Sequence, residues 1–121
     1  MASVKKHLPF LKVVLSSEPK LRQQIILNCD LDLINTINEC VYNTLKGNIP
    51  LKRSEIIKLQ KFKKILRKIC CCDDELEKTR KVIVQSGGEF LPTLLQPIVK
   101  AGEQYFFTKE MTKRKKFNVG K

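Results

Sequence analysis

Basic residues crowd one helix-length segment of this 121-residue chain. Between Lys52 and Lys68 there are eight basic residues and one acid, Glu55. At about 100° per residue, an α-helix would separate these basic residues from the apolar ones. The basic side would hold Arg53, Lys61, Lys64, Arg67 and Lys68, and the apolar side Leu59, Phe62, Ile65, Leu66, Ile69 and Cys70. Such a helix can dock on a core and present a cationic stripe to a polyanion, most commonly nucleic acid.

The residue types in this stripe favour contacts with phosphates over reading of bases. Lysine, a flexible point charge, outnumbers arginine, the bidentate base reader. The only aromatic residue of the segment, Phe62, falls on the apolar side, which argues against base stacking. We therefore expect sequence-independent binding of double-stranded DNA through its phosphate backbone. The residues expected to carry it are Arg53, Lys58, Lys61, Lys64, Arg67 and Lys68, helped by Lys113, Arg114, Lys115 and Lys116 near the end of the chain.

Catalytic and metal-binding patterns are missing from the sequence. His7 is the only histidine, so a Ser-His or Cys-His arrangement would need it at the centre. There is no phosphate-cradling glycine loop. The cysteines lack the paired spacing of zinc sites, and Cys40 and Cys70 suit small apolar packing positions. We therefore expect no enzyme activity, no cofactor, no metal and no small-molecule substrate.

The net charge of +12 is unevenly distributed. Residues 1–51 carry +2, residues 52–88 carry +6 and residues 89–121 carry +4. An excess of this kind suits nucleic acid, an anionic membrane surface or simple solvation. No signal peptide opens the chain, and no run reaches the roughly 18 apolar residues of a spanning helix. We expect a protein that is neither secreted nor transmembrane, in the nucleus or the cytoplasm.

Apolar periodicity predicts an all-α fold, a compact bundle of four to five short helices over about residues 1–86. The clearest helix begins at a cap, Asp30 or Asp32, and ends at Lys46, where Gly47 supplies a left-handed turn. The basic helix is expected over residues 54–71 as one element. Residues 87–121 are expected to be flexible: a Gly-Gly break, an apolar segment in which Pro92 and Pro97 oppose one long helix, and a basic tail.

Several segments in order resemble small basic proteins of Maverick/Polinton elements and adintoviruses. The segments are MASVKKHLPFLK at 1–12, KGNIPL at 46–51, KILRK at 64–68 and QSGG at 85–88. Residues 87–97, GGEFLPTLLQP, also resemble the precursor of adenovirus core protein X, the source of the mu peptide. In that precursor, a DNA-condensing part ends in Gly-Gly before an apolar segment.

The resemblance implies a virion core protein that compacts double-stranded DNA, in the virion and in the host nucleus. It also implies a viral cysteine protease as a partner. The protease would recognise Gly87 and Gly88 and cut once, after Gly88, so that Glu89 begins the released segment.

Two other classes of function stay open on the sequence alone. The clean helix ending at Lys46 and the near-neutral first half of the chain suit a helical protein-protein interaction adaptor of the death-fold kind. The apolar residues 90–99, together with Tyr105, Phe106 and Phe107, suit the precursor of a membrane-active peptide.

Overall fold

The computed structural model describes residues 2–72 and 75–104. These residues form eight α-helices and no strand, so the predicted all-α class and compact bundle are confirmed, with more helices than the four or five expected. The helices are α1 (Ala2–Lys6), α2 (Leu8–Ser16), α3 (Pro19–Asn28), α4 (Leu31–Lys46), α5 (Arg53–Gln60), α6 (Lys63–Cys70), α7 (Leu76–Gln85) and α8 (Phe90–Gln104). None of them is long and apolar enough to cross a membrane.

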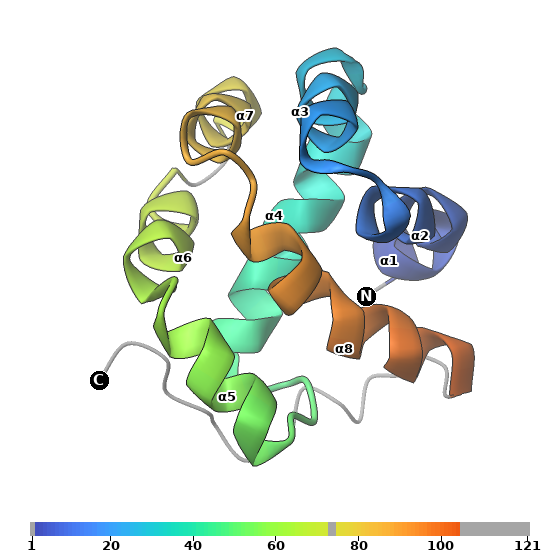
Figure 1. The fold of residues 1–121 in the computed structure, drawn as a ribbon, viewed down its shortest axis with the longest axis vertical. Helices are drawn as coiled ribbons and strands as arrows, with labels where there is room; N and C mark the ends of the chain where they lie inside the picture. The colour runs from blue at the N-terminus through green and yellow to red at the C-terminus, as the bar shows by residue number, and fades with distance from the viewer. Residues whose placement is uncertain (1, 73–74, 105–121) are drawn as a thin grey trace.

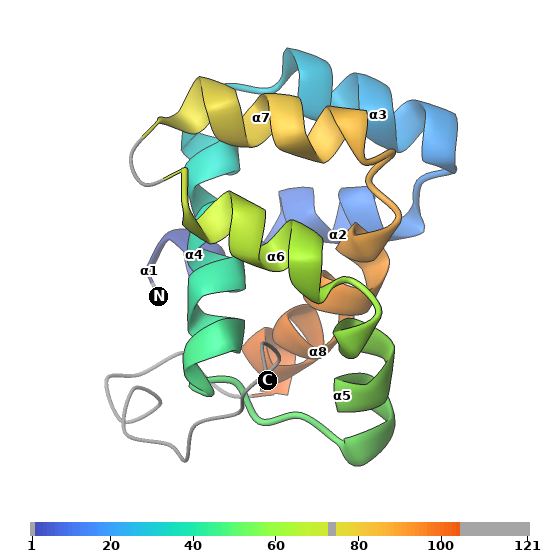
Figure 2. The same cartoon turned by 90° about the vertical axis from the view of Figure 1, so that its left-hand side faces the viewer.

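Helix α4 contacts α1, α6, α7 and α8; it crosses behind α8 in Figure 1 and runs along one side of the bundle in Figure 2. Its ends follow the sequence signals: the Asp30 carboxylate accepts a hydrogen bond from the Leu33 backbone N–H at 3.1 Å, and Gly47 closes the helix at φ 81°. The first of the two candidate caps is therefore the one used. One face of α4 is fully buried and supplies the centre of the core, through Leu33, Ile34, Ile37, Cys40 and Val41.

The basic segment forms two helices, so the expectation of one helix over residues 54–71 is wrong. The backbone leaves helical geometry at Phe62, with φ −109° and ψ 15°. The two halves pack on different partners, since α5 contacts α8 whereas α6 contacts α4 and α7. Phe62 lies at the bend, and its ring centroid is 6.5 Å from that of Phe90 in α8. A bend allows each half to bury its own apolar residues.

The chain continues into a core helix after Gly88, so the expected boundary at residue 86 and the expected flexibility of the apolar segment are wrong. Helix α8 contains Pro97 and packs against α2, α4 and α5. Pro92 lies in the first turn, where backbone N–H groups have no intrahelical acceptor. An interior proline costs about 3 kcal/mol, and burying one large apolar side chain stabilises by about 1.5–3 kcal/mol. Helix α8 buries six large apolar residues: Phe90, Leu91, Leu94, Leu95, Ile98 and Val99.

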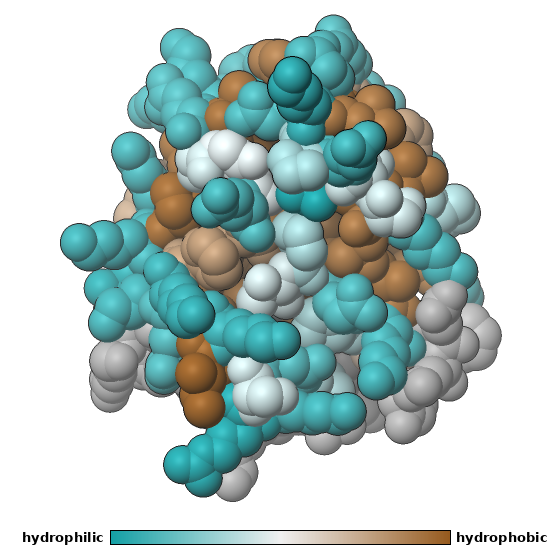
Figure 3. All heavy atoms as spheres, in the orientation of Figure 1, coloured by the Kyte–Doolittle hydropathy of each residue, from teal (hydrophilic) through white to brown (hydrophobic). Residues whose placement is uncertain are grey.

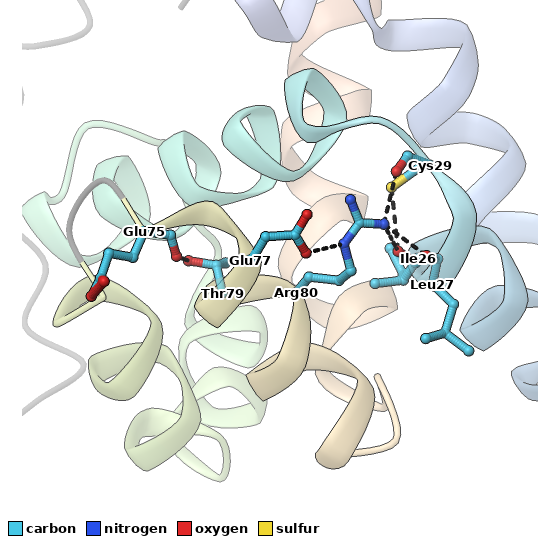
Figure 4. A network of polar contacts seen from close by, with 7 residues as sticks. All are labelled: Ile26, Leu27, Cys29, Glu75, Glu77, Thr79 and Arg80. Atoms are coloured by element: carbon cyan, nitrogen blue, oxygen red, sulfur yellow. Dashed lines mark hydrogen bonds and ion pairs between the residues drawn. The ribbon is translucent and has the colours of Figure 1, made fainter.

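Two arginines donate hydrogen bonds to backbone carbonyl groups at the C-terminal ends of neighbouring helices. Arg80 of α7 donates from Nη1 to the carbonyl oxygens of Ile26 (3.0 Å), Leu27 (2.8 Å) and Cys29 (2.8 Å) at the end of α3, and from Nε to Glu77 at 3.1 Å (Figure 4). These carbonyls lack intrahelical partners, and the helix dipole favours a cation there. The buried Arg22 of α3 likewise donates to the Ser17 carbonyl, at 2.8 Å, just beyond α2.

Leu94→Ala tests whether α8 belongs to the folded unit. Leu94 is fully buried, so the truncation should lower the free energy of unfolding by about 2–5 kcal/mol. Urea unfolding followed by circular dichroism measures the change. The matched control is Gln96→Ala, which removes an exposed side chain from the same helix and should change the unfolding free energy by less than about 0.5 kcal/mol. Equal stability of the two variants would contradict the packing of α8 described above.

Candidate nucleic-acid interface

The two basic helices lie next to each other on one side of the molecule (Figures 1 and 2). All six basic residues predicted for this segment are exposed. Figure 3 shows hydrophilic side chains at the left and lower edges, over the positions of α6 and α5, and also at the top of the view, over α7 and α3. We call this set the basic face: Arg53, Lys58, Lys61, Lys64, Arg67 and Lys68.

Helix α6 explains how the face is held outward. Leu66 and Ile69 are fully buried, whereas Lys64, Arg67 and Lys68 point to solvent from the opposite side. In α5, Leu59 is fully buried and takes the same inward role. Because the apolar residues fix the rotation of each helix, the cations cannot turn inward without exposing the core.

The cations of the basic face keep their charge available. Within residues 2–72 and 75–104, none of the six forms an ion pair with a carboxylate. Glu55, the single acid among them, accepts a hydrogen bond from the backbone N–H of Lys52 at 2.7 Å and so serves the start of α5. Exposed cations that form no ion pair with a carboxylate create a positive potential that attracts a polyanion.

His7 takes part in an arrangement that the sequence analysis did not foresee. Its Nε2 lies 3.2 Å from Asp32 Oδ2, and its Nδ1 lies 3.2 Å from Thr36 Oγ1. Asp32 and Thr36 are one turn apart on α4, and this spacing is the only feature of the sequence that could have indicated the arrangement. The order resembles a hydroxyl-histidine-acid triad, but the Thr36 side chain is fully buried and also donates to the Asp32 carbonyl at 3.0 Å. The contacts therefore join the start of α2 to α4 and present no accessible nucleophile.

The cysteines are free thiols in different environments. Cys40 and Cys72 are buried, Cys29 and Cys70 are half-buried against the core, and Cys71 is exposed at the end of α6. The packing role predicted for Cys40 and Cys70 agrees with these positions. Burial, with a contribution from the Glu39 carboxylate, raises the pKa of the Cys40 thiol far above its usual value. In the described part of the chain, no three His, Cys, Asp or Glu side chains group so as to hold a metal ion.

The expected processing site is a tight turn between α7 and α8. Gly87 and Gly88 have φ values of +82° and +69°, in the left-handed region that favours glycine. Gly88 is buried, and a Cβ at that position would lie 3.5 Å from Leu91 Cδ1. The four basic residues expected to help, Lys113, Arg114, Lys115 and Lys116, lie outside the described residues.

A separate apolar groove of about 940 Å³ lies along α7, beside the end of α3 and the start of α4. Its apolar lining includes Leu27 and Leu31, which are 45% and 38% exposed, together with Leu76 and Val84. The sequence does not predict this groove, because the residues that line it come from three helices. The only available signal was two leucines flanking the break at residues 29–30.

No protein-family model, curated protein or solved structure matches this chain.

Thiol reactivity tests the exposure of Cys71, after α6, and the burial of Cys40, in α4. The thiolate is the reactive form, so the exposed Cys71 should react fastest with an aromatic disulfide reagent at neutral pH. The raised pKa and the burial of Cys40 should make it react only when the protein unfolds. Cys71→Ser should therefore remove the fastest phase of the reaction and Cys40→Ser should not. Loss of the fastest phase in Cys40→Ser instead would contradict the placement.

Proposed function

We propose that this protein binds and condenses double-stranded DNA without sequence specificity, as a virion core-like protein. The observation that carries the proposal is the basic face, six exposed cations with no carboxylate partner among the described residues. Phosphates of the duplex would replace water and counterions around these side chains. The release of counterions from the duplex supplies much of the binding free energy.

The composition of the face supports backbone contacts over base contacts. Four of its six members are lysines, which bind phosphate as point charges. The one aromatic side chain of the segment, Phe62, is half-buried and packs near Phe90, so it offers no stacking platform for a single strand. These features favour a duplex and tolerance of any sequence.

The resemblance to small basic proteins of Maverick/Polinton elements, and to the adenovirus core protein X precursor, supports a role in the virion and the host nucleus. Cleavage after Gly88 by a viral cysteine protease belongs to the same proposal. Because Gly88 is buried and the following residues form a core helix, such a cut requires local opening of the α7–α8 turn.

Reversing three charges tests the basic face. Lys61, Lys64 and Lys68, changed together to Glu, should abolish retention of a random-sequence duplex in a mobility-shift assay while helical content stays intact. The matched control changes Lys20, Lys81 and Lys100 to Glu; these are exposed lysines of α3, α7 and α8, and the net charge falls equally. The control should keep most of the binding. Equal loss in both variants would mean that net charge alone, and not this face, binds DNA.

The salt dependence of the unmodified protein tests the mechanism. Contact with about five phosphates, at about −0.9 per phosphate, gives a slope of roughly −4.5 for log K against log salt. The mobility shift should be measured between about 50 and 200 mM salt, with single-stranded RNA as competitor. A flat response would contradict neutralisation of phosphates.

A helical protein-protein interaction adaptor is the second candidate function, and the groove along α7 favours it. An open apolar groove with exposed leucines suits the apolar face of a partner helix. For the membrane-active peptide, the large apolar side chains of residues 90–99 are buried in α8, and Tyr105, Phe106 and Phe107 lie outside the described residues.

Leu31→Asp tests the adaptor candidate. A protein complex formed through the groove should survive nuclease treatment and should be lost in Leu31→Asp, because a carboxylate would be placed in an apolar contact. Leu21→Asp is the control, since Leu21 is exposed on α3 but does not line the groove. A complex that nuclease removes, or that both variants keep, would contradict this candidate.

A further inference from the structure

Ile57 is an exposed apolar residue within the basic face. Its side chain is 54% exposed, whereas Leu59 on the same helix is fully buried. Arg53, the first residue of α5, precedes Ile57 by one helical turn. Lys61 follows it by one turn; it lies directly after the last residue of α5, Gln60, and keeps helical φ and ψ of −64° and −24°, so the three residues face the same side. Both flanking cations are exposed.

Exposure alone does not distinguish Ile57, since single apolar side chains are common on protein surfaces. Phe10, Val13 and Leu21 are exposed to a similar degree on α2 and α3. Ile57 differs in its neighbours: Arg53, Lys58 and Lys61 surround it within one turn, and none has a carboxylate partner among the described residues. A duplex held by these cations would therefore be pressed against an apolar side chain.

We propose that Ile57 is a wedge that enters the minor groove of bound duplex DNA and partly unstacks one base step. The inference rests on the proposed function and adds that the protein bends the duplex it binds. Arg53 begins α5 and Lys61 follows its last residue, so the two lie about 12 Å apart along the helix direction, at about 1.5 Å per residue, and can hold phosphates on both sides of the wedge. Apolar side chains inserted in this way kink a duplex by about 20–90°.

A bend also connects the wedge to condensation. A stiff duplex resists compaction over its persistence length of about 50 nm, and local kinks relieve that stiffness. Pyrimidine-purine steps unstack most easily, so the wedge would settle on them without any hydrogen bond to a base. Binding then stays tolerant of sequence overall.

Energy transfer between dyes at the two ends of a short duplex measures the bend. The full-length protein should shorten the end-to-end distance at low salt. Ile57→Ala should keep the affinity within about threefold and the salt slope unchanged, because the phosphate contacts remain, but should lose the bend. Ile57→Leu should keep the bend, since leucine also serves as a wedge.

The control is Leu21→Ala, because Leu21 is also 54% exposed but lies on α3, outside the basic face. This variant should bend the duplex as the unmodified protein does. Binding without a bend, an unchanged bend in Ile57→Ala, or an equal loss in Leu21→Ala would each overturn the wedge and leave the proposed function standing. Failure of the unmodified protein to bind the duplex would overturn the proposed function itself.

Discussion

Burial of apolar helix faces around α4 and α8 is the constraint on which the rest of the structure depends. The helices of the described residues are 5 to 16 residues long, a length at which most isolated helices are marginal in water. Each therefore holds its shape by packing on its neighbours. Helices α5 and α6 meet this requirement on different partners, and the bend at Phe62 is the result. The basic face lies on the sides of these two helices opposite the buried Leu59, Leu66 and Ile69.

Short helices also create many ends whose carbonyls need partners. Arg80 and Arg22 meet part of that need from neighbouring helices, and Gln23 of α3 donates to the Val84 carbonyl of α7 at 2.8 Å. The α3–α7 pair is thus tied at both ends by side chains (Figure 4 shows the Arg80 end). Arg22 and Arg80 are therefore structural, whereas the cations on α5 and α6 bind no helix-end carbonyl among the described residues. This division separates the basic face from the two arginines that bind helix ends.

Local signals predicted the elements whose ends are encoded in neighbouring residues. Helix α4 was predictable from Asp30 and Gly47, and the exposed side of α6 from its alternation of cations with Leu66 and Ile69. Helix α8 was not predictable, because Pro97 opposes an uninterrupted helix locally, although Pro92 fits the first turn, and only tertiary burial of residues such as Phe90 and Leu94 offsets that cost. The break at Phe62 and the contacts of Arg80 and His7 likewise depend on partners distant in the sequence.

The most direct test of the central claim is to map the surface that meets DNA. Amide chemical shifts of the isotope-labelled full-length protein should be followed by NMR during titration with a short duplex. We predict that the largest shift changes fall on α5 and α6, around Arg53, Lys61, Lys64 and Lys68. Changes centred on the α7 groove, changes spread evenly over all exposed lysines, or no changes at all would contradict it.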